Sequence, residues 1–146
     1  MEDAGRWAVY PSLKERVVVV TGGASGIGES IVEAFARQGA QVVFLDVQDE
    51  AAERLVRQLE GAGPVRPVYW HCDLTDMEEL RRVVGEVLVR FPRVDVLVNN
   101  AANDTRHAVE DVSAELWDRT IAVNLKHQFL MTQALLASMR AAGAQG

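Results

Sequence analysis

The sequence predicts an α/β fold built on an open, doubly wound parallel sheet. Two observations lead to this prediction. Continuous apolar runs, which are typical of strands buried on both faces, alternate along the chain with segments of helical periodicity. A glycine-rich turn also joins the first apolar run directly to the first helical segment. Right-handed crossovers then give the strand order 3-2-1-4, with a ligand crevice outside the carboxyl ends of the first and fourth strands.

The first half of the chain begins with a lead-in over residues 1–16 and then supplies two strand–helix pairs. Four consecutive valines at 17–20 form a β-branched run that favours a strand. Gly39 stands where a helix C-terminus often takes a left-handed residue, and Gly61 opens the break after the next helical pattern. The predicted elements are a strand over 17–21, a helix over 26–38, a strand over 41–46 and a helix over 49–60.

The second half continues the same alternation. Thr75 or Asp76 can cap the third helix, and a polar loop separates the fourth strand from the last helix. The predicted elements are a strand over 67–73, a helix over 76–90, a strand over 93–98 and a helix over 114–139. The chain has no internal repeat and no low-complexity linker, so we expect residues 1–146 to form a single domain.

Composition narrows the class of protein. Hydrophobic residues make up 49% of the chain, and 15 Lys and Arg face 21 Asp and Glu, for a net charge of −6. This acidic balance argues against binding to nucleic acid or to an anionic membrane surface. No apolar run reaches the roughly 20 residues of a membrane span. The single cysteine, Cys72, favours a reducing compartment and hence the cytoplasm, and the histidines show no metal-ligand spacing, so we expect no metal site.

The turn after the first strand is the first candidate binding site. Glycines there let the backbone approach a diphosphate closely, and the N-terminus of the following helix offers free N–H groups to it. A side chain at any of the three glycines would crowd the turn, the phosphates or the packing of helix on strand. The alternative is an ordinary tight connection without a ligand. The predicted phosphate-binding residues are Gly22, Ser25, Gly26, Ile27 and Gly28.

Asp46 is the second candidate, 18 residues after Gly28 at the end of the second strand. A carboxylate at this position accepts the ribose hydroxyls of NAD and repels the 2′-phosphate of NADP. Neither Asp46 with its neighbour Val47 nor the glycine turn contains a Lys or Arg, so we expect NAD rather than NADP. The alternative role for Asp46 is to cap the helix that follows.

Two further strand ends carry polar residues. Asp73 and Leu74 follow the third strand and are candidates to hold the edge and face of an adenine ring; Asp73 could equally be a turn or capping residue. Asn100 follows the fourth strand with the small residues Ala101 and Ala102, which suggests backbone lying close to a ligand. Plain turn chemistry is the alternative.

Asn124 is a polar residue within the last predicted helix, although asparagine is a mediocre helix former. From the residues alone we interpret it as structural, bonded to a buried water or a strand carbonyl. His127 is expected to face outward or sideways, and His71 to be half-buried in the third strand. The apolar stripe expected on this helix consists of Trp117, Ile121, Leu125, Phe129 and Leu136.

Taken together, these motifs resemble the short-chain dehydrogenase/reductase family, whose domain is Rossmann-like. Residues 21–28 match its TGxxxGxG turn, and the later signatures match at Asp46, at 72–74, at 99–101 and at 123–125, in order and at the family's spacings. The resemblance implies that Asn124 is catalytic, holding a water in a proton relay, and that Val123 lies at the cofactor. More loosely, segments 10–14, 44–46 and 103–107 resemble bacterial aldose dehydrogenases, xylose- or arabinose-type, of this family.

Two features depart from the family pattern. Glycine is usual where Ala102 stands, so the loop beside the nicotinamide is expected to be slightly tighter. The family's catalytic serine and Tyr-x-x-x-Lys helix follow a fifth strand, so we expect this domain to be truncated before that strand and its sheet to be incomplete at the C-terminal side. Tyr10 and Lys14 have the Tyr-x-x-x-Lys spacing but precede the first strand. They are therefore expected at the far end of a strand that spans about 16 Å, too far from the ligand site for proton transfer.

The expected function follows from the resemblance: hydride transfer between NAD and a sugar or other secondary alcohol or carbonyl, in a homo-oligomer. The chain alone is expected to be inactive because it lacks the general acid/base. Its last helix is also expected to expose apolar residues and so to promote self-association. The alternative is a dinucleotide-binding or interaction module without catalysis.

Overall fold

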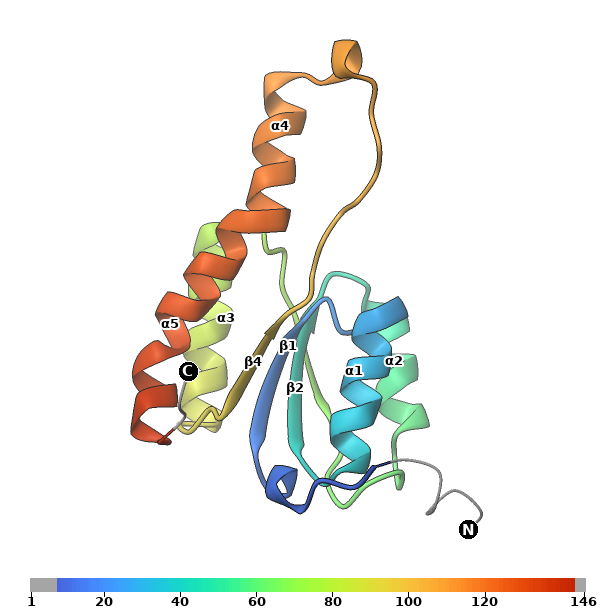
Figure 1. Cartoon of the computed structure of the whole chain (residues 1–146), viewed down its shortest axis with the longest axis vertical. Coiled ribbons are helices and arrows are strands. Elements are labelled where there is room, and N and C mark those ends of the chain that lie inside the picture. The colour runs from blue at the N-terminus through green and yellow to red at the C-terminus, as the bar shows by residue number, and fades with distance from the viewer. Residues whose placement is uncertain (1–7, 144–146) are drawn as a thin grey trace.

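A four-stranded parallel sheet forms the centre of the molecule, in a computed structural model that describes residues 8–143 (Figure 1). The first part of the lead-in, residues 1–7, and residues 144–146 lie outside the described range. The strand order is β3-β2-β1-β4, which confirms the predicted order 3-2-1-4. The strands are β1 (Val17–Thr21), β2 (Gln41–Asp46), β3 (Val68–His71) and β4 (Val96–Asn99).

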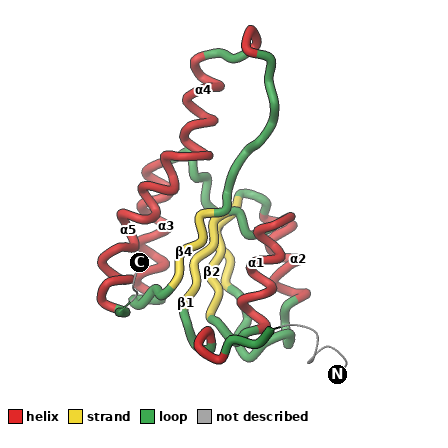
Figure 2. The backbone as a smooth tube through the Cα atoms, in the orientation of Figure 1, coloured by secondary structure: helices red, strands yellow, loops and turns green. Residues whose placement is uncertain are grey.

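Helices cover both faces of the sheet (Figure 2). The first pair, α1 (Gly26–Arg37) and α2 (Asp49–Gln58), packs on one face. The second pair, α3 (Met77–Arg90) and α5 (His127–Ala141), packs on the other. The doubly wound α/β class is therefore confirmed.

The packing of β1 against helices on both faces explains its run of valines. Val18 and Val20 point into the core under α1 and α2, whereas Val19 points into the core under α3 and α5. All three are at most 1% exposed. Each fully buried side chain of this kind stabilises the fold by about 1.5–3 kcal/mol. A strand with helices on both faces has no polar face, so alternation gives way to a continuous apolar run.

Several element boundaries differ from the sequence prediction by one to three residues. β3 ends at His71 rather than at 73, because Asp73 turns the chain by accepting hydrogen bonds from Thr75. β4 covers 96–99 rather than 93–98. Helix α2 ends at Gln58 rather than at residue 60.

The last predicted helix is a continuous rod with a change of winding in its middle. It consists of α4 (Ala114–Ile121), a π-helical turn (Ala122–Lys126) and α5, which reaches Ala141. A short 3₁₀ turn (Val109–Asp111) lies in the loop before it, and another (Pro11–Leu13) precedes β1. The loop after β4 and α4 project together beyond the carboxyl edge of the sheet (Figure 1).

The rod faces the sheet with a stripe other than the predicted one. Its buried residues are His127, Met131 and Leu135, each 0% exposed. The residues expected as its apolar stripe are instead exposed by 36–64%: Trp117, Ile121, Leu125, Phe129 and Leu136. The prediction that the last helix exposes apolar residues is thereby confirmed. None of the helices within residues 8–143 combines the length and hydrophobicity that a membrane span requires.

Candidate cofactor-binding site

The glycine turn joins β1 to α1 at the carboxyl edge of the sheet. Gly22 has φ +67° and lies so close to β4 that a Cβ on it would stand 2.8 Å from the Cα of Ala101. A Cβ on Gly28 would collide with the carbonyl oxygen of Gly22. Glycine is therefore needed at both positions, one for the approach of the fourth strand and one for the packing of α1 on the turn.

The N-terminus of α1 faces open space. Gly26 has φ +58°, and a Cβ placed on it would meet nothing within 4 Å. Ser25 is the N-cap residue, and its side chain makes no capping hydrogen bond, so the first N–H groups of the helix remain free to bind an anion. The next residue, Ile27, is 77% exposed. Free N–H groups beside a side-chain-free backbone fit a diphosphate.

Asp46 lies directly against this turn. Its Oδ2 accepts a hydrogen bond from the N–H of Ala24 at 2.9 Å, and its Oδ1 accepts from the N–H groups of Val47 and Gln48 at 2.8 and 3.0 Å. The N-cap of α2 is Gln48, so Asp46 does not cap that helix. A carboxylate can accept about four hydrogen bonds, and Oδ2 keeps capacity for a ligand hydroxyl.

Gln48 ties the two candidate segments together. Its Nε2 donates to Ser25 Oγ at 3.0 Å and lies 3.4 Å from Asp46 Oδ1. Val47 is 52% exposed beside them. Among the ion pairs of residues 8–143, none involves Asp46, so its charge is not offset by a paired cation.

The end of β3 brings Asp73 to the same edge of the sheet. Its Oδ1 accepts from the Thr75 N–H at 2.8 Å and from the Thr75 hydroxyl at 2.7 Å. These hydrogen bonds lower the pKa of the Asp73 carboxyl, which is therefore ionised. Leu74 is 7% exposed and packs into the core with α3 and α5.

The segment after β4 is fastened to the end of β1. Asn100 donates through Nδ2 to the carbonyl oxygens of Thr21 and Gly22, at 3.1 and 3.0 Å. The N–H groups of Asn100 and Ala101 both donate to Thr21 Oγ1 at 3.1 Å. Ala102, next along the chain, is exposed. The Asn100 side chain therefore holds β1 and β4 together, and the small residues Ala101 and Ala102 follow it along the chain.

Asn124 and Val123 lie in the π-helical turn. The Asn124 amide pairs with a single backbone residue: Oδ1 accepts from the Asn103 N–H at 2.7 Å, and Nδ2 donates to the Asn103 carbonyl at 2.8 Å. Asn124 thus fixes the loop after β4. Its carbonyl oxygen accepts from Gln128 Nε2 at 2.8 Å.

His127 was misplaced by the sequence prediction, and its partner Thr21 was missed as a site residue. His127 is fully buried instead of facing outward, and its Nε2 lies 3.3 Å from Thr21 Oγ1. Its Nδ1 donates to the Val123 carbonyl oxygen. One signal was available in the sequence: His127 stands four residues before Met131 and eight before Leu135, on the row that faces the sheet.

His71 and Cys72 also differ in their surroundings. His71 is exposed, not half-buried, and its Nδ1 lies 2.8 Å from Asp49 Oδ1, which raises the pKa of the imidazole. Tyr69 donates to the same oxygen at 2.5 Å. Cys72 is buried, and burial raises the pKa of its thiol to about 12, so it is not a nucleophile at neutral pH. Within residues 8–143, no three metal-ligating side chains come together.

The geometry gathers most of the predicted binding residues at one edge of the sheet. A model of the family named short chain dehydrogenase matches residues 16–146. The chain belongs to the short-chain dehydrogenase family.

Individual relatives and structures support this assignment. The chain is 48% identical over 136 residues to D-xylose 1-dehydrogenase from Caulobacter vibrioides, covering 93% of this chain and 53% of that protein. The structure of L-sorbose reductase from Gluconobacter frateurii, complexed with NADPH and L-sorbose, matches with a TM-score of 0.84 and 30% identity over 90% of this chain and 50% of that one. NADH-dependent reductase A1-R′ complexed with NAD matches with a TM-score of 0.82 and 30% identity over 91% and 56%.

The chain spans about half the length of D-xylose 1-dehydrogenase and of similar curated relatives. The strand order and the matching structures establish a Rossmann-like fold. Structures of its neighbours include complexes with NADPH and with NAD.

Proposed function

We propose that this chain supplies the cofactor cleft of an NAD-dependent oxidoreductase that moves hydride between the nicotinamide and an alcohol or carbonyl carbon. The observation that carries the proposal is the hydrogen bond from Ala24 to Asp46, which sets a buried carboxylate against the open N-terminus of α1. A diphosphate at that N-terminus would then have its adenosine ribose at Asp46.

Each predicted contact has a role in this proposal. Gly22, Gly26 and Gly28 shape the turn, Ser25 and Ile27 flank the diphosphate, and Val47 lies beside the ribose. Asp73 and Leu74 border the adenine, while Asn100, Ala101, Ala102 and Val123 line the path toward the nicotinamide. The bound nicotinamide supplies the hydride acceptor or donor; the residues named here bind it and orient it.

The charge of Asp46 supports NAD over NADP. Three N–H donors fix the position of the carboxylate, and it pairs with no cation within the described part of the chain. A 2′-phosphate at this position would place like charges together in a site of low exposure.

Asn124 has a proposed catalytic role as the holder of a water molecule in the proton relay. Its Oδ1 and its Nδ2 are each engaged once with Asn103, and each can form one more hydrogen bond. The same contacts give it a structural role, since they hold the loop that follows β4.

The substrate is proposed to be a sugar or another small polyol. The support is the 48% identity to D-xylose 1-dehydrogenase, together with the likeness to L-sorbose reductase. The exposed loop over 103–113, which contains His107, lies above the carboxyl edge of the sheet, where a substrate would approach (Figure 1).

The chain alone is proposed to bind the cofactor without efficient turnover. It contains two tyrosines. Tyr10 lies before β1, at the opposite end of the sheet, and its N–H donates to Gln38. Tyr69 donates a hydrogen bond to Asp49, and burial together with this carboxylate raises the pKa of Tyr69 well above the usual value of a tyrosine. Neither can act as a general acid/base in the cleft. This observation also favours the second candidate function, a dinucleotide-binding module without catalysis.

Two properties of the whole protein are also proposed. The exposed apolar face of the rod supports a homo-oligomer. The single buried cysteine supports a reducing, cytoplasmic location.

Calorimetric titration of the 146-residue chain with NAD and with NADP tests the cofactor site. We expect NAD to bind more tightly than NADP, and Asp46→Ala to weaken NAD binding at least about tenfold, because it removes a charge-assisted hydrogen bond to the ribose. Asp118→Asn, an exposed acid on α4, is the matched control and should change nothing.

A dehydrogenase assay on the same preparation separates the two functions. Loss of the general acid/base lowers turnover by about 10²–10⁴-fold on its own. Rapid NADH formation from a sugar would contradict the proposed inactivity of the chain. If neither NAD nor NADP bound at millimolar concentration, both candidate functions would be excluded.

A further inference from the structure

We propose that His127 is a positioning residue of the cofactor cleft. It turns the Thr21 hydroxyl so that the oxygen accepts hydrogen bonds from the Asn100 and Ala101 backbone, and it holds the π-helical turn that carries Asn124. The inference rests on the proposed cofactor function of this edge of the sheet. It begins from the one histidine that is completely buried among the described residues.

The contacts of His127 assign its tautomer. Nδ1 faces the carbonyl oxygen of Val123, and a carbonyl can only accept, so Nδ1 carries the proton. In a neutral imidazole Nε2 is then an acceptor. The group beside Nε2, at 3.3 Å, is the Thr21 hydroxyl, which must therefore donate.

This assignment determines what Thr21 does with its lone pairs. With its proton directed to His127, Thr21 Oγ1 offers both lone pairs to other donors. The N–H groups of Asn100 and Ala101 reach that oxygen at 3.1 Å each. One hydroxyl thus makes three hydrogen bonds, and Thr21 is 0% exposed, so water cannot replace any of them. The imidazole therefore sets the rotation of the Thr21 hydroxyl, and this rotation lets the oxygen accept both N–H groups of the backbone after β4.

The other side of the ring acts on the helix. At the π-helical turn the backbone N–H of His127 donates to Ala122, five residues back. Side chains supplement the backbone bonds there: His127 donates to the carbonyl of Val123, and Gln128 donates to the carbonyl of Asn124. Asn124 in turn holds Asn103. His127 therefore connects the Thr21 end of β1 with the turn that presents Asn124.

The surroundings keep the ring in the required state. Burial lowers the pKa of His127, so the imidazole is neutral at physiological pH. An imidazolium would donate from both nitrogens, and Thr21 Oγ1 would then face three donors with two lone pairs. The simpler alternative is that His127 only fills space in the row of Met131 and Leu135.

Amide exchange and NAD affinity distinguish positioning from filling. In the 146-residue chain, His127→Leu removes both polar contacts, His127→Asn can retain the donor to Val123, and His127→Gln can retain the acceptor for Thr21. We expect the Asn100 and Ala101 amides to exchange at least about tenfold faster in the Leu and Asn variants and within about threefold of wild type in the Gln variant, since one lost hydrogen bond is worth about a factor of ten. The dissociation constant for NAD should likewise rise more in the Leu and Asn variants than in the Gln variant.

Met131→Ala is the control, because it removes packing one turn further along α5 without touching Thr21. It should lower the midpoint of thermal unfolding and leave both amides and the NAD affinity unchanged. Normal exchange at Asn100 and Ala101 in a folded His127→Leu variant would overturn the inference, whatever the cofactor affinity. Unchanged NAD affinity together with fast exchange would also overturn it, because positioning would then have no consequence at the cleft.

A measurement on the wild-type chain covers the case in which the variants do not fold. Nitrogen-15 spectra of the histidine ring should show a protonated Nδ1 and an unprotonated Nε2. The opposite tautomer, or an imidazolium at neutral pH, would overturn the inference. If wild type failed to bind NAD while the tautomer and exchange results held, the proposed function would fail and the positioning network would stand.

Discussion

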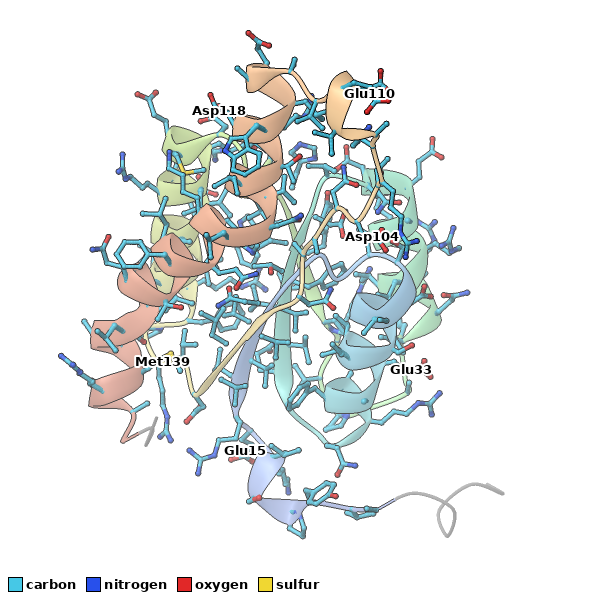
Figure 3. All side chains as sticks on the ribbon, turned by 45° about the horizontal axis from the view of Figure 1, so that its top comes forward. Glu15, Glu33, Asp104, Glu110, Asp118 and Met139 are labelled. Atoms are coloured by element: carbon cyan, nitrogen blue, oxygen red, sulfur yellow. The ribbon has the colours of Figure 1, made fainter. Side chains whose placement is uncertain are left out.

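At the scale of single residues, the two ends of β1 are fixed by polar contacts with the segments just before and just after β4. At the carboxyl end, Thr21 accepts from the backbone after β4. At the amino end, Asp95 accepts the Val17 N–H at 2.9 Å and pairs with Arg16 at 2.6 Å and Arg93 at 2.9 Å. The Asp95 side chain is only 5% exposed. Glu15, which precedes Arg16 in the chain, is labelled in Figure 3. Satisfied polar groups at both ends set the register of β4 against β1.

Asp95→Asn tests the polar contact at the amino end. Burial opposes ionisation of Asp95, but the hydrogen bonds from Val17, Arg16 and Arg93 outweigh it and lower the pKa. A lowered folded pKa gives stability that is present above the unfolded value of 3.8 and is lost as the pH falls through the folded value. We expect Asp95→Asn to lower the free energy of unfolding by about 1–3 kcal/mol at pH 7.

Urea denaturation at pH 7 and near pH 3 measures this difference. The gap between wild type and Asp95→Asn should shrink at the lower pH, because below the unfolded value of 3.8 protonation of the wild-type carboxyl favours the unfolded state. Asp118→Asn, exposed on α4 and labelled in Figure 3, is the control and should match wild type at pH 7. A gap that stayed constant with pH would contradict the ionic origin of the contact.

At the scale of elements, the sheet covers only the α5 part of the rod, and only on one side. Its outer face carries Trp117, Leu125 and Phe129, which are 60–64% exposed. Leu125 and Phe129 are four residues apart, so their side chains lie on one face of the helix and form an apolar surface there. Exposed apolar surface of this kind favours association.

Sedimentation velocity on the 146-residue chain tests that surface. We expect association that depends on protein concentration, and we expect Leu125→Gln with Phe129→Gln to shift the protein toward monomer. Val89→Gln is the matched control, because Val89 is 87% exposed and belongs to α3, not to the rod. A wild-type chain that stayed monomeric at high concentration would contradict the expected self-association.

At the scale of the whole molecule, the sheet joins two cores. Phe44 and Leu55 belong to the core under α1 and α2, and Leu45 and Leu80 to the core under α3 and α5. Adjacent residues of the same strand enter opposite cores, so neither core can lose its packing without disturbing the strands that the other one needs. We infer that the described part of the chain unfolds as one cooperative unit.

Leu55→Ala and Leu80→Ala test this cooperativity. Leu55 is 2% and Leu80 is 1% exposed, so each substitution leaves a cavity and should lower the free energy of unfolding by about 2–5 kcal/mol. Far-ultraviolet and near-ultraviolet circular dichroism should give coincident transitions in both variants. Two separate transitions, with only one of them shifted in each variant, would show instead that the cores unfold independently.

Much of the site could be predicted because parallel strands end together. Asp46 is the last residue of a strand, and Gly22 and Asn100 each follow one; strands in the order 3-2-1-4 bring these ends to one edge. The contacts of Asp46 with Ala24 and of Asn100 with Gly22 realise that expectation. The binding roles themselves stay predictions, to be decided by titration.

The orientation of the last helix could not be predicted from apolar spacing. Two rows on it repeat at about the helical period, one through Leu125 and Phe129 and the other through His127 and Met131. Hydrophobicity favours the first row, yet the second is buried. A histidine can be buried there because Thr21, 106 residues away in the sequence, supplies the partner for its ring.

The sequence by itself determined the alternation of strands and helices, the strand order and the glycine turn, because burial on both faces and a close backbone approach each require particular residue types. Only the tertiary structure decided which side of the last helix meets the sheet, where the helix changes to a π turn, and that Asn124 and His127 join the loop after β4 to the end of β1. Those outcomes depend on hydrogen-bond partners brought together by the fold, and no local pattern in the chain encodes them.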